Sequence, residues 1–279
     1  MKKVIKVSPS ILNEFAQFKG GNYEKWGKTQ EDFRQYVLGE YSPNPATSRG
    51  TAVHSILEGK PGVNTLGGVA VHEKELNTKW VFTPDVFLAV HEYGKRYEHA
   101  AHEIPDTIRI ELACATVYMN MRFDCLDGLE LHEFKTSSKP KKYADYYDSL
   151  QWRCYMMALP DVQKVNYHVF VMPEAIPGNI ITDVKTYSFT YPREANNDAT
   201  VLTWLNELTA WVLDDSEMFG KLSLDFARMA SKMGDIVQAV YDEEESPVNA
   251  RRELYKVAGN YDELQDYLNA CLLELKDAK

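Results

Sequence analysis

The chain has 279 residues, 44% of them hydrophobic, which is enough for one large domain or for a domain with an appendage. Its formal net charge of −10 argues against a nucleic-acid partner, because binding to phosphates depends largely on Lys and Arg. The charge is uneven, however, because residues 1–200 carry −2 and residues 201–279 carry −8. A nucleic-acid partner for the first 200 residues is therefore not excluded.

The first residues of the chain, its hydrophobic pattern and its cysteines predict an intracellular protein. The basic start of the chain runs into Ser8-Pro9-Ser10 rather than an apolar segment, and no stretch reaches membrane-spanning length. The four cysteines lie far apart and form no C-x-x-C pair, which predicts reduced thiols rather than a zinc ribbon or a disulfide framework. We expect a cytoplasmic location and no membrane partner.

The first hundred residues predict helices and a few short strands. Ser10 is a candidate cap for an opening helix, and Gly59 with Pro61 closes a later one. In chain order we expect helices over residues 10–15, 30–38 and 48–58, strands over 68–72 and 79–82, and a helix over 84–102.

From residue 107 the pattern changes to short β-rich runs. Thr107–Ala113, Thr116–Asp124 and Leu129–Thr136 are separated by brief breaks, which predicts consecutive antiparallel strands. A helix over Tyr143–Leu159 follows, then strands over residues 162–172 and 180–191, and helices from residue 196 onward. The predicted class is α/β of the mixed type, a central mixed β-sheet flanked by helices, with residues 1–195 as one domain. Residues 196–279 form an acidic helical extension packed on or next to it.

Two carboxylates and a lysine converge on this predicted sheet. The antiparallel return of the chain brings Asp124 near Glu133, and the two-residue period of a strand puts Glu133 and Lys135 on one face. Hard oxygen ligands hold Mg²⁺, which polarises a phosphoryl oxygen and activates a water molecule, and a lysine stabilises the developing charge. The grouping predicts phosphodiester hydrolysis.

This core resembles that of the PD-(D/E)xK nucleases, in the form found in RecB-type, RecE-type and lambda-exonuclease-like members. The resemblance begins with Asp124 followed by Glu133-Phe134-Lys135, although Phe123 replaces the proline of the family name. Three further segments match in the expected order: Ser8-x-Ser10-x-Leu12-x-x-Phe15, Gly50-Thr51-Ala52-Val53-His54-x-x-Leu57-Glu58 and Gln151-x-x-x-Tyr155. The resemblance implies a restriction-endonuclease-like core.

The resemblance also implies roles for individual residues. The metal ligands would be His54, Asp124, Glu133, the Phe134 carbonyl and, where many relatives place a further acid, Glu111. The catalytic lysine would be Lys135, with Gln151 and Tyr155 on one helix face bordering the scissile phosphate. Each has an ordinary structural alternative: His54 and Tyr155 as core residues, and Glu111 and Gln151 as solvated surface groups. The metal would be Mg²⁺, with Mn²⁺ as a substitute, and no iron–sulfur cluster is expected because the cysteines do not form the matching set.

Basic residues around this core predict a phosphate-binding rim. They are Arg49, Lys139, Lys141, Lys142 and Arg153. No base-reading module and no helicase motif is present, which favours a stand-alone exonuclease that resects duplex DNA ends in recombination or repair, of the kind that phages encode and that acts in the host cytoplasm. The resemblance implies a homo-oligomer and a single-strand annealing protein as partners. The alternatives are a non-catalytic nuclease-fold interaction module and a nuclease acting on RNA.

Overall fold

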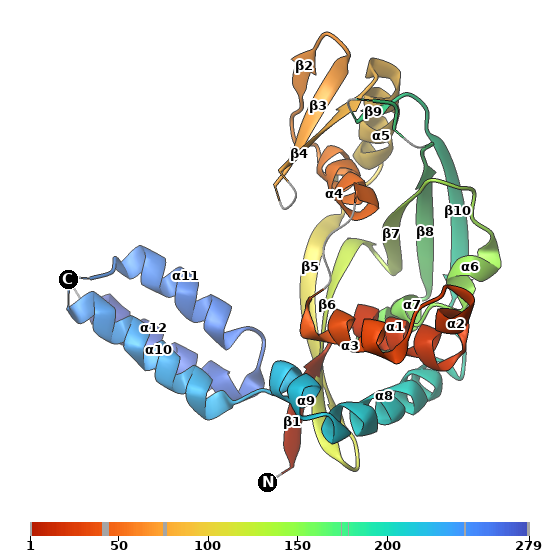
Figure 1. Cartoon of the computed structure of the whole chain (residues 1–279). Coiled ribbons are helices and arrows are strands. Elements are labelled where there is room, and N and C mark those ends of the chain that lie inside the picture. The colour runs from red at the N-terminus through yellow and green to blue at the C-terminus, as the bar shows by residue number, and fades with distance from the viewer. Residues whose placement is uncertain are drawn as a thin grey trace.

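The computed structural model describes residues 2–40, 45–74, 77–173, 175–177, 179–242 and 244–277. Its centre is a six-stranded mixed sheet in the order β1-β6-β7-β8-β10, with β5 also paired to β6 (Figure 1). β1 pairs with β6, and β7 with β8, in parallel; the other pairs are antiparallel. The strands are β1 Lys3–Val7, β5 Ala101–Glu111, β6 Ala115–Asp127, β7 Glu130–Ser137, β8 Lys164–Val171 and β10 Lys185–Pro192.

One face of the sheet is covered by helices from residues 9–38 and 143–222 (Figure 1). Leu12 of the first helix, Trp152 and Leu205 share one apolar cluster with Leu131 and Val165 of the sheet. Because α8 and α9 belong to this cluster, the chain after residue 195 begins as part of the same core. The helices on this side are α1 Pro9–Lys19, α2 Asn22–Lys25, α3 Gln30–Leu38, α6 Tyr143–Tyr147, α7 Gln151–Ala158, α8 Asn197–Asp214 and α9 Ser216–Leu222.

The opposite face carries a second layer made of two helices and a small sheet. Val53 and Ile56 of α4 pack with Trp80 of β4 and with Phe134 and Phe170 of the large sheet. β8 is consequently covered on both faces, which explains why seven of its eight residues are buried. The elements of this layer are α4 Pro45–Leu57, α5 Pro84–Lys95, β2 Val63–Thr65, β3 Gly68–Glu73, β4 Thr78–Phe82 and β9 Ile180–Ile181, the four strands being ordered β2-β3-β4-β9.

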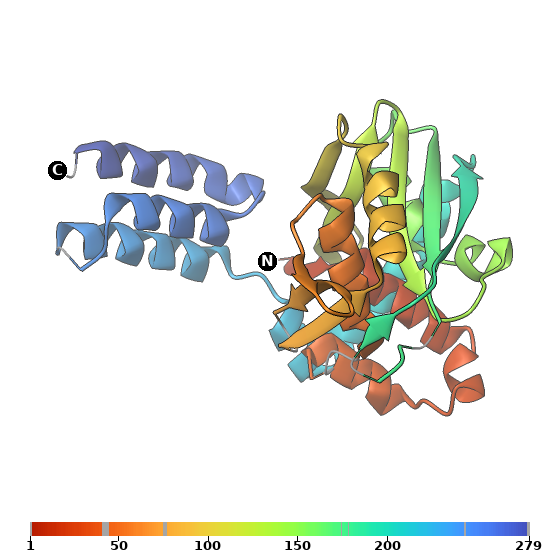
Figure 2. The ribbon, with the colours of Figure 1, turned by 90° about the horizontal axis from the view of Figure 1, so that it is seen from above.

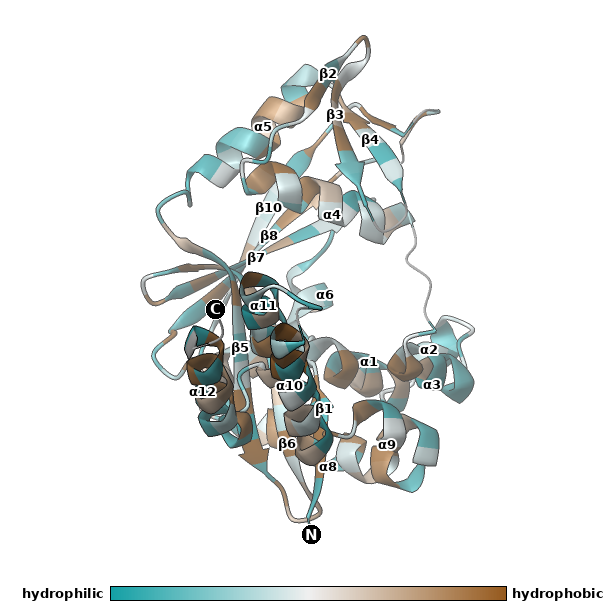
Figure 3. Cartoon of the chain, turned by 90° about the vertical axis from the view of Figure 1, so that its left-hand side faces the viewer, coloured by the Kyte–Doolittle hydropathy of each residue, from teal (hydrophilic) through white to brown (hydrophobic). Residues whose placement is uncertain are grey.

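The last three helices form a separate bundle that extends away from the sheet (Figure 2). They are α10 Phe226–Tyr241, α11 Pro247–Ala258 and α12 Asp262–Asp277, and each carries apolar and polar stretches as amphipathic helices do (Figure 3). Tyr118 of β6 is buried in the bundle's apolar cluster, and its hydroxyl donates to Glu263. Among the described residues, no helix combines the length and apolar character needed to cross a bilayer.

The predicted fold class is confirmed: a central mixed sheet flanked by helices, followed by a helical region. The domain boundary at residue 195 stays a prediction. Several element boundaries were wrong. The helix predicted to end at residue 102 stops at Lys95, because β5 already begins at Ala101. The opening helix is capped by Ser8, whose side chain accepts from the Ile11 amide, and not by Ser10.

Two more predicted segments are divided in the structure. The helix over residues 143–159 is two helices, because Asn13 accepts a hydrogen bond from the Leu150 amide (3.0 Å) where the chain turns between them. The strand over residues 180–191 is also two pieces, β9 in the small sheet and β10 in the large one.

Candidate metal centre

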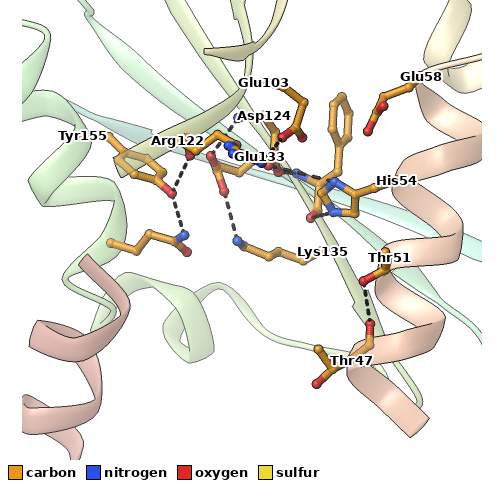
Figure 4. A network of polar contacts seen from close by, with 12 residues as sticks. Thr47, Thr51, His54, Glu58, Glu103, Arg122, Asp124, Glu133, Lys135 and Tyr155 are labelled. Atoms are coloured by element: carbon orange, nitrogen blue, oxygen red, sulfur yellow. Dashed lines mark hydrogen bonds and ion pairs between the residues drawn. The ribbon is translucent and has the colours of Figure 1, made fainter. Parts of the chain in front are cut away.

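Asp124 and Glu133 meet where β6 and β7 separate. The two strands pair only beside their turn, from Asp127 to Cys125 on β6, and β7 then continues along β8. At this fork the Phe134 amide donates to Asp124 Oδ2 (2.8 Å), and the Asp124 amide donates to Glu133 Oε1 (3.4 Å) (Figure 4). The two carboxylates therefore replace strand pairing at the fork, which fixes their positions.

His54 comes to the same place from α4. Its Nε2 lies 2.9 Å from the Phe134 carbonyl oxygen, which can only accept, so Nε2 carries the proton. In the neutral ring Nδ1 is then the nitrogen that can bind a metal, and it lies 3.9 Å from Asp124 Oδ1. Gly50, one turn earlier, lets α4 approach β7, because a Cβ there would lie 3.2 Å from Thr136 Oγ1.

Glu103 is the third member of this group, and sequence reasoning missed it. His102 pairs with Cys125 and Ile104 with Phe123, so Glu103 stands opposite Asp124. Its backbone has φ of 50°, an uncommon value for a residue other than glycine and one that costs conformational energy. Ligand atoms of His54, Glu103 and Asp124 all lie within 4.8 Å of one another, close enough to hold one metal ion.

Glu133 and Lys135 form a buried pair next to this group. Glu133 is only 1% exposed, and its Oε2 accepts from Lys135 Nζ at 2.9 Å. Burial raises the pKa of Glu133, although Lys135 opposes the rise. Burial acts to lower the pKa of Lys135, but the two nearby carboxylates outweigh it and keep the ammonium charged. The pair presents a fixed cation at the wall of the cleft.

Glu111, the predicted further acid, is not brought to the metal group. It lies at the other end of β5, opposite Thr116, and its carboxylate accepts from Lys2 (2.7 Å) and lies 2.8 Å from Arg109. The hydrogen bond from Lys2 is the main reason that its pKa is lowered. Glu103 stands where we had expected Glu111.

Gln151 and Tyr155 face each other on α7, as predicted. Gln151 Nε2 donates to the Tyr155 hydroxyl (2.6 Å), which donates in turn to the Arg122 carbonyl (3.3 Å). Tyr155 is 3% exposed, so it holds the backbone of β6 from behind and does not line the open cleft.

Two of the five predicted DNA-binding residues are engaged in the interior. Arg49 is buried and donates to the Pro173 carbonyl (3.2 Å), and Arg153 is buried, paired with Glu194 (2.7 Å) and stacked on Trp152. Neither is presented to a phosphate, and the sequence gives no sign of this burial. The remaining three are exposed in the segment between β7 and α6: Lys139, Lys141 and Lys142.

The metal group opens into a cleft of about 680 Å³ between α4 and the sheet. His54, Glu103 and Lys135 contribute to its walls, together with Arg122, which sequence reasoning did not single out. Arg122 precedes Asp124 by two residues on β6, so the two-residue period of the strand was a signal that placed both on one face.

Comparisons with known proteins do not identify the chain. No family model matches it, and no curated protein matches it. A solved structure described as the crystal structure of SSO0001 aligns with a TM-score of 0.40 and 12% sequence identity, over 76% of this chain and 78% of that chain. At this identity and TM-score the match assigns neither a family nor a function.

Proposed function

We propose that this chain is a divalent-metal-dependent deoxyribonuclease with a restriction-endonuclease-like core. The proposal is carried by one observation: His54, Glu103 and Asp124 converge beside the Glu133–Lys135 pair, at the wall of one open cleft that His54, Glu103 and Lys135 line. Carboxylates and an imidazole can hold a divalent cation, and a charged lysine can stabilise the negative charge that develops as a phosphodiester is hydrolysed.

The donor set fits Mg²⁺ or Mn²⁺. Glu103 and Asp124 offer hard carboxylate oxygens, and Nδ1 of His54 lies 3.9 Å from Asp124 Oδ1. A bound cation would polarise the phosphoryl oxygen and lower the pKa of a water molecule. His54, Glu103 and Asp124 would hold it.

The remaining residues orient these groups or act on the phosphate. The Phe134 carbonyl holds His54 in the tautomer that leaves Nδ1 free, and its amide orients Asp124. Glu133, with both oxygens engaged by Lys135 and the Asp124 amide, holds the lysine in place. The Lys135 ammonium faces the cleft and would stabilise negative charge on the phosphate as the bond to the leaving oxygen breaks.

The biological setting rests on the sequence motifs. Their resemblance to RecE-type and lambda-exonuclease-like proteins favours an exonuclease that resects duplex ends in recombination or repair. It also favours a single-strand annealing protein as partner and a homo-oligomer as the working form. These are parts of the same proposal. An assay on end-labelled duplex, single-stranded and circular DNA separates exonuclease from endonuclease activity, and the same assay on end-labelled RNA tests for ribonuclease activity.

The direct test is cleavage of linear duplex DNA with Mg²⁺, Mn²⁺ or EDTA. We expect cleavage with either metal, none with EDTA, and a loss of about 100-fold or more for Lys135→Ala. Lys164→Ala is the matched control, because Lys164 is also paired with a glutamate on the sheet (2.8 Å, Glu130) and should leave cleavage unchanged. Full activity of a folded Lys135→Ala protein would refute the assigned site, whereas no cleavage by the wild-type chain with either metal would favour a non-catalytic interaction module.

A further inference from the structure

The cleft contains cations, yet each is paired with a carboxylate. Among the described residues, three basic side chains of Lys or Arg line it: Lys60, Arg122 and Lys135. Lys60 lies 2.5 Å from Glu58, Arg122 lies 3.3 Å from Glu103, and Lys135 lies 2.9 Å from Glu133. Each cation is therefore partly neutralised by its partner, which weakens the attraction of the cleft for the DNA backbone.

Arg122 differs from the other two cations in its partner. Glu103 belongs to the group that could hold a metal, whereas Glu58 and Glu133 do not. The Arg122 side chain is 68% exposed, so its guanidinium is free to turn, and an exposed ion pair contributes little to stability. The carbonyl of Arg122 accepts from the buried Tyr155 hydroxyl, which keeps the backbone in place while the side chain moves.

The position of Arg122 also suits a phosphate contact. It lies two residues before Asp124 on the same face of β6, which is roughly 7 Å along the strand. Figure 4 shows Arg122 beside Glu103 and Asp124. A DNA strand whose phosphate reached the metal group would pass within reach of a guanidinium, which binds phosphate through two parallel hydrogen bonds.

We propose that Arg122 is a phosphate-binding residue that Glu103 masks until a divalent cation occupies the neighbouring site. The cation takes up the negative charge of Glu103, the ion pair weakens, and Arg122 turns to the DNA backbone. Metal then controls DNA binding as well as chemistry, and by linkage DNA tightens metal binding. The inference rests on the proposed function, because it takes DNA as the substrate.

The test measures DNA binding and not cleavage. A short fluorescent duplex is titrated with the full chain in Ca²⁺ or in EDTA, at several salt concentrations, and a gel confirms that the DNA is intact. Ca²⁺ is the probe because it takes the same oxygen ligands as Mg²⁺. We expect Ca²⁺ to tighten binding by the wild-type chain about threefold to fivefold, because breaking an exposed ion pair releases no more than that pair contributed.

Arg122→Ala should lose most of this gain while matching the wild type in EDTA. In Ca²⁺ its plot of log affinity against log salt should be shallower by about 0.9, the loss of one phosphate contact, with no change of slope in EDTA. Glu103→Gln should bind more tightly than the wild type in EDTA, because its Arg122 is unmasked. Arg109→Ala is the matched control, since Arg109 is paired with Glu111 at the far end of β5.

The outcomes separate the two proposals. If Arg122→Ala keeps the full Ca²⁺ gain, or weakens binding equally in Ca²⁺ and EDTA, the masking of Arg122 is refuted while the nuclease proposal stands. If the wild-type chain binds no DNA in either condition, both fail. A calcium titration of Arg122→Ala in the absence of DNA should show binding at least as tight as that of the wild type, which shows that the metal site is intact.

Discussion

Glu103 and Glu111 lie on the same strand, β5, but their surroundings differ. They lie near opposite ends of the antiparallel β5–β6 pair, here called the β5–β6 ribbon. Eight residues separate them, roughly 27 Å along an extended strand. Glu103 faces Asp124 and an open cleft, whereas Glu111 is held by Lys2, Arg109 and Thr116. Neighbours across the ribbon, and not residue type or strand, decide which acid is available to a metal.

The end of the ribbon that carries Glu111 also carries the bundle. Tyr118 of β6 inserts into the apolar cluster of α10–α12, and Asn120 donates to the Tyr261 hydroxyl (3.0 Å). One end of the ribbon therefore builds a candidate chemical site, and the other attaches a helical unit. Substitutions at the two ends should affect different properties.

The largest effect is expected at the bundle end. Tyr118→Ala removes a side chain that is 1% exposed and should lower the free energy of unfolding by about 3–5 kcal/mol, the range for aromatic residues truncated in a core. Urea unfolding measures the loss, and limited proteolysis should release residues 226–277. Tyr255→Ala, at an exposed tyrosine of α11, is the control. Equal stability of the two variants would show that Tyr118 does not attach the bundle.

At the cleft end, Glu103→Gln should reduce metal-dependent DNA cleavage by about 10²–10³-fold, because a neutral amide is a poorer ligand than a carboxylate. Glu111→Gln should leave cleavage unchanged. The same gel assay run on both variants compares two identical substitutions on one strand. A large loss for Glu111→Gln with none for Glu103→Gln would reverse the assignment.

An intermediate effect is expected from the pH dependence of the free energy of unfolding. It should come from the sheet, which buries histidines, and not from the bundle, whose sequence contains none. Burial, with His132 nearby, lowers the pKa of His168 to about 3. The folded chain keeps His168 neutral while the unfolded chain, with a pKa near 6.5, takes up a proton, so stability falls as the pH drops below 6.5. At pH 5 this single group costs about 2 kcal/mol.

Urea unfolding at several pH values measures this dependence. His168→Gln should flatten the curve between pH 7 and pH 5, whatever its effect on absolute stability. His132, whose pKa burial also lowers, adds to the same slope, and Glu133, whose pKa burial raises, opposes it. A curve as steep as that of the wild type would mean that His168 does not carry the dependence.

The smallest effect is expected for the stability of Glu111→Gln. Its ion pairs with Lys2 and Arg109 are exposed to solvent, and pairs of that kind contribute little to stability. Thermal unfolding at low and high salt should show a small loss that salt diminishes. A loss as large as that of Tyr118→Ala would mean that Glu111 has a structural role that its exposure does not suggest.

The fold class could be predicted from the sequence because it depends on local patterns, namely the spacing of apolar residues and the position of turns. Alternation and the turn at Asp127-Gly128 predicted β6 and β7, and helical spacing predicted the C-terminal helices. Local patterns could not predict features that depend on contacts between residues far apart in the chain. The break before Leu150 depends on Asn13, which is 137 residues away, and the division of residues 180–191 depends on β4.

The site was partly predictable for the same reason. Asp124, Glu133 and Lys135 lie on adjacent strands, and the periodicity of two sufficed to group them. Glu103 was missed because the helix was extended to residue 102, which hid the first half of β5. Counting outward from the turn between β5 and β6 places residue 103 opposite Asp124, so correct strand ends would have favoured Glu103 over Glu111.

The central claim, a metal site formed by His54, Glu103 and Asp124, is tested most directly by calorimetric titration of Mn²⁺ into the folded chain without DNA. We expect one binding event in the wild type and in Glu111→Gln, weakened about tenfold or more in Glu103→Gln and in Asp124→Asn. Equal Mn²⁺ affinity in Glu103→Gln and the wild type, or no binding to the wild type, would contradict the account.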